Sequence, residues 1–153
     1  MKITYRKINE SFAARIWEIE RTFPEWFKAC NAVWTPDYDS YLAFFRNCSE
    51  VYGMFSGEEL AAVVYLEIEG ERVNIHVSVI SETDRKFIIA FFCSLLKKKG
   101  AEGVRDYRAW IFEKNRGLKK IAEEVGFIKT GLKLYKGVSK NSPIRWFEFI
   151  RRQ

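Results

Sequence analysis

One histidine stands among polar neighbours on a predicted strand, and it is the first candidate for chemistry in this sequence. His76 is the only histidine of the chain and lies in the segment 72–80, where apolar residues at odd positions alternate with Asn74, His76 and Ser78. These three polar side chains therefore share one face of the strand. Imidazoles exchange protons near neutral pH. His76 is thus either a general base or a strand residue that faces solvent or a helix.

Basic side chains are the second group that could bind a ligand. The chain has 26 Lys and Arg against 20 Asp and Glu, a net charge of +6, which favours anionic partners such as phosphorylated cofactors or nucleic acid. Arg85 and Lys86 stand near a helix start, where they are either a phosphate clamp or the solvated side of that helix. Basic and aromatic residues also interleave over 145–152. A half-buried edge strand explains that pattern better than nucleic-acid stacking does.

The three cysteines, Cys30, Cys48 and Cys93, predict neither a disulfide framework nor a metal centre. Their number is odd, no two have CxxC spacing, and His76 is the only histidine that could join them. Structural zinc sites need four soft ligands at short spacings. We therefore expect no metal.

These side chains have to be positioned by alternating strands and helices. Period-two and period-3.6 patterns, separated by capping and turn residues, divide the chain into eleven elements. Short loops between 51 and 80 indicate an antiparallel meander. The predicted order is strand 1–5, helices 11–23 and 36–46, strands 51–55, 60–68 and 72–80, helix 81–99, strand 105–112, helix 115–125, and strands 127–136 and 144–151. This order predicts an α/β (α+β) fold, a mixed sheet with helices on both faces.

The length of the chain bounds its organisation. With 153 residues, one domain over 1–153 is expected. The longest apolar run, 87–96, is about half the ~20 residues that cross a bilayer. We therefore expect a cytoplasmic protein without a membrane partner.

The segment Asn115–Phe127 reads NRGLKKIAEEVGF. It resembles the late helix of the GCN5-related N-acetyltransferases (GNAT), in which Asn begins a helix that ends in Gly-Phe. The order of elements along nearly the whole chain is similar to that family as well. The resemblance implies a GNAT-like acyl-CoA N-acyltransferase fold, acetyl-CoA as co-substrate and a primary amine as acceptor.

The resemblance also implies where acetyl-CoA binds. The donor would lie between the parted strands 72–80 and 105–112, with the backbone of Val77, Ser78 and Val79 along its pantetheine arm. The diphosphate would lie at the next helix start, and Asn115 would lie near the thioester. The implied diphosphate cradle spans Thr83 to Ile88 and includes Thr83, Asp84, Arg85 and Lys86.

The sequence departs from its relatives at two places. Lys86 and Ile88 stand where they carry small residues, and a β-branched Ile88 is expected to obstruct close approach to the diphosphate, with Arg85 and Lys86 compensating by charge. Ala122 stands where many relatives place a tyrosine that protonates the leaving thiolate. Tyr135, on the penultimate strand, is the candidate substitute acid, with ordinary strand packing as its alternative.

An aromatic cluster completes the expectations. Trp17, Trp26, Phe27 and Trp34 fall in the first helical region, which in the family closes over the acceptor. Such a lining suits an apolar or flat acceptor, and a homodimer surface is the equal alternative.

We therefore predict an N-acetyltransferase in which an amine, deprotonated by His76 or through water, attacks the thioester of acetyl-CoA directly. One alternative is a catalytically degenerate GNAT-like structural or interaction protein, for example a phage-encoded one, since some tailed-phage virion proteins look like this fold. A nucleic-acid-binding protein is the remaining alternative.

Overall fold

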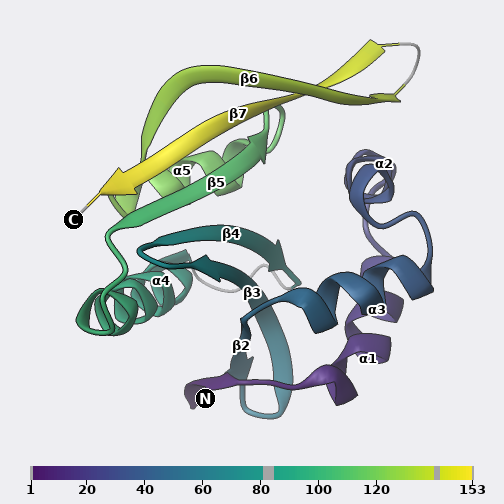
Figure 1. Cartoon of the computed structure of the whole chain (residues 1–153). Coiled ribbons are helices and arrows are strands. Elements are labelled where there is room, and N and C mark those ends of the chain that lie inside the picture. Colours follow the sequence, from purple (N-terminus) through teal and green to yellow (C-terminus); the bar gives the residue numbers. More distant parts are fainter. Residues whose placement is uncertain (1, 81–84, 140–141, 153) are drawn as a thin grey trace.

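The computed structural model describes residues 2–80, 85–139 and 142–152. Their strands form one mixed seven-stranded sheet in the order β1-β2-β3-β4-β5-β7-β6 (Figure 1). The pair β4–β5 is parallel and the other neighbours are antiparallel. The strands are β1 Ile3–Lys7, β2 Glu50–Ser56, β3 Glu59–Glu69, β4 Arg72–Val79, β5 Asp106–Phe112, β6 Ile128–Ser139 and β7 Ser142–Arg152.

Helices cover the two faces of this sheet. On one face α1 and α3 pack over β2 and β3, and α2 packs over the far end of β5, β6 and β7. The opposite face carries α4 and α5, which contact each other. In Figure 1, α1 to α3 gather at the right and α4 lies at the left. The helices are α1 Ala13–Glu20, α2 Glu25–Trp34, α3 Tyr38–Asn47, α4 Arg85–Ala101 and α5 Arg116–Glu124, with a 3-10 turn at Glu10–Phe12.

The predicted fold class and sheet pattern are confirmed, and two details of the helices are corrected. The segment after Pro24 forms its own helix, α2, which the sequence interpretation did not predict. Helix α3 is capped by Asp37 rather than Thr35: Ser40 N donates to Asp37 Oδ1 at 2.8 Å. An aspartate accepts such a bond as readily as a threonine does. The helix therefore starts two residues later than expected.

Helix α2 is held against β6 at a glycine. Gly137 has a φ of +85°, and a Cβ at this position would overlap the side chain of Val33. Only a residue without a side chain permits both the backbone conformation and the contact. The close approach places one side of α2 beside the ends of β5 and β7.

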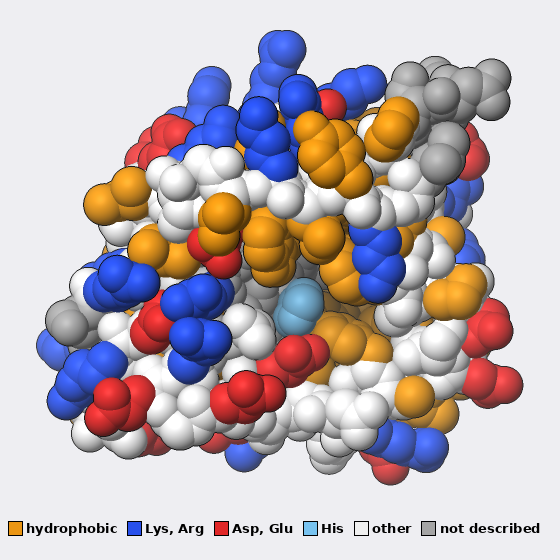
Figure 2. Space-filling model, turned by 45° about the horizontal axis from the view of Figure 1, so that its top comes forward, with side chains coloured by type: hydrophobic (Ala, Val, Ile, Leu, Met, Phe, Trp, Pro, Cys, Tyr) orange, Lys and Arg blue, Asp and Glu red, His pale blue; other side chains and the backbone are white. Residues whose placement is uncertain are grey.

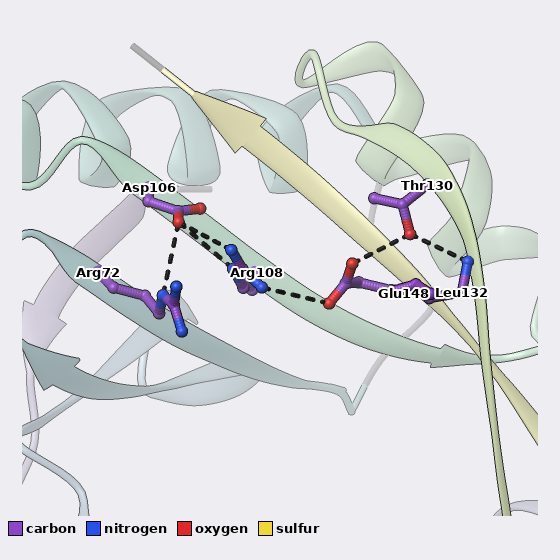
Figure 3. A network of polar contacts seen from close by, with 6 residues as sticks. All are labelled: Arg72, Asp106, Arg108, Thr130, Leu132 and Glu148. Carbon is purple, nitrogen blue, oxygen red and sulfur yellow. Dashed lines mark hydrogen bonds and ion pairs between the residues drawn. The ribbon is translucent and has the colours of Figure 1, made fainter.

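A polar network ties four strands together at the end of the sheet where β4 and β5 pair (Figure 3). Asp106 of β5 accepts from Arg108 Nη2 at 3.2 Å and pairs with Arg72 of β4 at 3.5 Å. Arg108 reaches Glu148 of β7 at 3.6 Å, and Thr130 of β6 donates to the same carboxylate at 3.0 Å. Since Arg108 is only partly exposed and Glu148 is buried, these charged contacts are less screened than surface pairs.

Lys99, the last residue of the run Lys97 to Lys99, is buried although lysine is seldom found in a protein interior. Its side chain is 2% exposed, its Nζ pairs with Glu50 of β2, and Glu102 lies at 2.7 Å. A buried ammonium is tolerated because the carboxylates replace its lost hydration. Lys99 therefore fastens the end of α4 to β2.

Substituting Lys99→Ala is expected to lower the free energy of unfolding by about 2 kcal/mol. Breaking a fully buried pair costs roughly 3–5 kcal/mol, and the partial exposure of Glu50 and Glu102 reduces that figure. Urea unfolding measures the change. Lys97→Ala, at an exposed site in the same helix, is the control and should change stability by less than about 0.5 kcal/mol. Equal effects of the two variants would contradict this account of Lys99.

Within the described ranges, no helix combines the length and the apolar character that crossing a membrane requires.

Candidate functional site

The parallel strands β4 and β5 part within the sheet. Their pairing covers three residue pairs and ends at Asn74 opposite Arg108, yet β4 continues to Val79 and β5 to Phe112. Figure 1 shows the two strands diverging beyond this point. The polar network of Figure 3 lies at the paired end. The two strands β4 and β5 are therefore paired at one end and parted at the other.

The open edge of β4 presents backbone groups to the gap. Ile80 N donates to Ala61 O of β3 at 2.9 Å, so by alternation the even residues of β4 pair with β3. The odd residues Ile75, Val77 and Val79 consequently direct their N–H and C=O groups toward β5, beyond the point where the β4–β5 ladder ends. An extended ligand could take up these groups as an added strand.

A cleft of about 340 Å³ occupies the opening and passes through the sheet. On one face its wall is α2, with Trp26, Cys30 and Asn31, and on the other face it is α5, with Leu118 and Ala122. Figure 2 shows the mouth of a hollow bordered by hydrophobic side chains, with the one histidine, in pale blue, inside it. Two ligands could thus enter from opposite faces and meet between β4 and β5.

His76 lines this cleft together with an acidic neighbour from β3. Its Nε2 lies 3.4 Å from Glu67 Oε1, and its ring packs edge-on against Phe44 at 5.2 Å between centroids. The hydrogen bond from His76 lowers the pKa of the Glu67 carboxyl. Glu67 can therefore orient the imidazole and leave its other nitrogen for proton transfer. The sequence interpretation missed Glu67, because nothing in the alternation of β3 distinguishes it from a solvated strand end.

The residues expected to bind the donor do not all lie at the cleft. Val77 and Asn115 line the cleft, and Asn115 also caps α5 by accepting from Leu118 N at 3.2 Å. Val79 stands at the open edge of β4. Ser78 does not contribute: its backbone faces β3 by alternation, and its buried hydroxyl donates to Glu20 at 2.7 Å.

The basic residues at the start of α4 have protein partners. Arg85 Nη2 lies 3.4 Å from Glu124 Oε1 of α5, with both side chains about half exposed. Lys86 Nζ lies 5.3 Å from the ring centroid of Phe87. Thr83 and Asp84, the first residues of the expected cradle, lie outside the described residues. The phosphate clamp stays a prediction.

Tyr135 is not brought into the cleft. Its side chain is 59% exposed on β6, where Arg145 is its cross-strand neighbour. It is absent from the residues lining the cleft. β6 is the outermost strand of the sheet, and β7 lies between it and β5. Its expected role as a substitute acid is not supported by this position.

Ala122 and Ile88, at which the sequence departs from its relatives, lie in different parts of the structure. Ala122 is buried on α5 and lines the cleft, so a larger side chain here would project into it. Ile88 is 2% exposed in the core beneath α4 with Phe91. Neither Ile88 nor Phe87 lines the cleft. The side chain of Ile88 therefore points into the core, away from the cleft.

A buried carboxyl group links the α2 wall of the cleft to β4. Glu20, at the end of α1, accepts from Ser78 and from Asn31 Nδ2, the latter at 3.5 Å. Burial raises the pKa of this carboxyl. Asn31 lines the cleft, so Glu20 supports the wall without reaching the cleft itself.

The raised pKa of Glu20 makes stability depend on pH. The folded state keeps a proton that the unfolded chain releases near pH ~4.3, so the free energy of unfolding contributed by Glu20 falls as pH rises above that value. Glu20→Gln keeps the hydrogen-bonding shape and removes the titration. We expect the variant to gain stability relative to the native chain as pH rises from ~4 to ~7. Urea unfolding across this range tests it, and a constant difference between the two proteins would contradict it.

Comparisons with known proteins complete the description of the site. Neither the protein-family models nor the curated proteins contain a match to this sequence. Solved structures do match over nearly the whole chain. The ribosomal L7/L12 alpha-N-protein acetyltransferase RimL, in complex with coenzyme A, matches with a TM-score of 0.78 and 13% identity, covering 99% of this chain and 94% of its own.

Two further acetyltransferases give similar values. The ribosomal-protein-S18-alanine N-acetyltransferase from Escherichia coli has a TM-score of 0.75 at 11% identity, over 99% of this chain and 94% of its own. A chimera of the spermidine N-acetyltransferase SpeG from Vibrio cholerae and hSSAT has a TM-score of 0.77 at 12% identity, over 99% and 96%. At such identities the likeness concerns the fold.

Proposed function

We propose that this chain, whose fold is that of the GCN5-related N-acetyltransferases, transfers an acetyl group from acetyl-CoA to a primary amine. The observation that carries the proposal is the parting of β4 and β5 beyond Asn74, with a cleft that passes through the sheet at that point. Transfer between two substrates requires that they meet in one place, and the cleft offers each of them its own entrance.

Acetyl-CoA would enter on the α4–α5 side. Its pantetheine arm would hydrogen-bond to the outward backbone of Val77 and Val79, with Asn115 beside the thioester. The diphosphate would lie at the start of α4, where Arg85 would exchange its exposed partner Glu124 for phosphate. An exposed ion pair of this kind is worth only about 0–1 kcal/mol, so the exchange costs little.

The amine would enter on the α2 side and approach His76. His76 would accept a proton from the ammonium, oriented by Glu67, and the free amine would attack the thioester carbon. A carbon–nitrogen bond forms and the carbon–sulfur bond breaks, so that the electron pair leaves on the sulfur of coenzyme A. The nitrogen gives up its second proton, directly or through water, to the departing thiolate, so that the products are an amide and the thiol of coenzyme A. A backbone N–H near Val79 would stabilise the negative charge that develops on the thioester oxygen.

Two measurements on the native chain test the proposal. Calorimetric titration with acetyl-CoA is expected to give saturable heat, and a thiol-reactive dye is expected to detect coenzyme A released only when an amine is present. No heat and no thermal shift at millimolar acetyl-CoA would reject the enzyme. Binding without release for a broad set of amines would favour a degenerate, noncatalytic protein.

A further inference from the structure

Aromatic side chains form the wall of the cleft on the acceptor side, and two of them are unusually exposed. Trp26 and Trp34 of α2 are 42% and 43% exposed, although both line the cleft. Trp110 and Phe112 of β5 and Trp146 of β7 complete this wall. Exposed indole surface within a concave site is free to bind a ligand, because burying it there is favourable.

Ring contacts hold these side chains in place. Trp26 stacks on Phe112, with centroids 5.9 Å apart and an interplanar angle of 23°. Trp34 meets Trp146 edge-on at 5.6 Å and 74°. Lys136 Nζ lies 3.9 Å from the ring centroid of Trp34. Phe112 therefore holds the indole of Trp26 in place, whereas Lys136 lies over the ring of Trp34. A flat ring that binds at Trp26 meets a preorganised surface and would lose little entropy on binding.

The charge of the cleft selects for a cation. Among the described residues that line it, Glu67 is the one acid, and none is a lysine or arginine. The lowered pKa of Glu67 keeps it ionised at neutral pH. Aromatic faces likewise attract an ammonium group. A carboxylate on a ligand bound at Trp26 would meet Glu67, since the nearby Lys136 lies at Trp34, at the other end of α2.

The volume of the cleft limits the ligand. About 340 Å³ lies at the lower end of the roughly 300–1,000 Å³ typical of small-molecule sites, and the thioester arm of the donor would share it. A single or fused ring with a short chain fits this space, whereas a folded protein surface would contribute only one side chain.

We propose that the acceptor is a small arylalkylamine without a carboxylate, its ring against the exposed indole of Trp26 and its ammonium group toward Glu67 and His76. This inference rests on the proposed function and names the substrate class of the same site. A linear polyamine would leave the indole surfaces without a partner, and an aromatic amino acid would place its carboxylate near Glu67.

Three probes distinguish these cases. Tryptamine, tryptophan and spermidine are titrated calorimetrically into the native chain, with and without coenzyme A. Tryptamine is expected to bind at least about tenfold more tightly than tryptophan, which adds a carboxylate, and than spermidine, which lacks a ring. Tryptophan or spermidine binding as tightly as tryptamine would overturn the inference.

Variants of the wall give the second readout. Trp26→Ala is expected to weaken tryptamine binding by about tenfold and to leave the affinity for coenzyme A unchanged. Tyr135→Ala removes an aromatic side chain of comparable exposure outside the cleft and should alter neither affinity. Unchanged tryptamine binding in Trp26→Ala would overturn the inference.

The two proposals fail in different ways. If coenzyme A binds and tryptamine does not, the donor site stands and the arylalkylamine inference is wrong. If tryptamine binds in the pattern above and coenzyme A does not, the aromatic site stands and the acetyltransferase proposal is wrong.

Discussion

The variant Ala122→Tyr is expected to turn over about 10² times faster than Ala122→Phe. Ala122 lines the cleft from α5. It stands at the position where many members of the family that this chain resembles carry a tyrosine. A phenol here could donate a proton to the departing thiolate, and general acid catalysis contributes roughly 10²- to 10⁴-fold. The phenylalanine variant fills the same volume without the acidic proton.

Steady-state release of coenzyme A with saturating tryptamine measures this effect. Both variants lose cleft volume equally, so affinity changes cancel in the comparison, and titration of acetyl-CoA checks that they do. Equal turnover numbers for the two variants would show that position 122 does not face the leaving group. That result would contradict the arrangement of donor and α5 described above.

The variant His76→Gln is expected to lose roughly 10²- to 10⁴-fold in turnover and to retain its affinity for acetyl-CoA. Glutamine keeps a hydrogen bond to Glu67 and cannot accept the proton of the ammonium group. The acidic limb of the pH–rate profile, which an imidazole base produces, should disappear in this variant. Stopped-flow or dye-coupled assays over the pH range measure turnover, and titration with acetyl-CoA measures the affinity.

Glu67→Gln is the companion variant. It keeps the imidazole and removes the charge that orients it, so a smaller loss in turnover is expected, with the acidic limb preserved. Native turnover in His76→Gln would assign deprotonation to water and leave His76 as a strand residue packed against Phe44.

The sequence predicted most of the sheet because the strands of the meander alternate regularly. In β4 the odd positions are apolar and pack toward α4, and the opposite face carries His76. Helix α5 was predicted for a similar reason: its Asn115 cap and apolar stripe are local signals. Helix α2 was missed, since Pro24 interrupts the pattern and no side chain caps its start.

The site was harder to predict because it depends on contacts between distant segments. Alternation placed His76 on the correct face, but only the pairing of β3 with β4 brings Glu67 to it. Ser78 lies two residues after His76 and on the same face of β4, but it is buried against Glu20. That contact joins residues 58 positions apart in the sequence. Tyr135 looked equivalent to other strand tyrosines, and it is not among the residues that line the cleft.

At their paired end, β4 and β5 are joined by charged contacts that the sequence did not reveal. The charged network from Arg72 through Asp106 and Arg108 to Glu148 fastens the strands at one end (Figure 3). Beyond it, Ile75, Val77 and Ala109 line the cleft. The charged network thus lies at the paired end, and the cleft lies beyond it.

A crystal structure of the protein with coenzyme A tests the central claim most directly. The account predicts electron density for the thioester arm between β4 and β5 past Asn74, hydrogen-bonded to the backbone of Val77 and Val79. Coenzyme A bound elsewhere, or β4 and β5 found paired along their full lengths with the cleft closed, would contradict it.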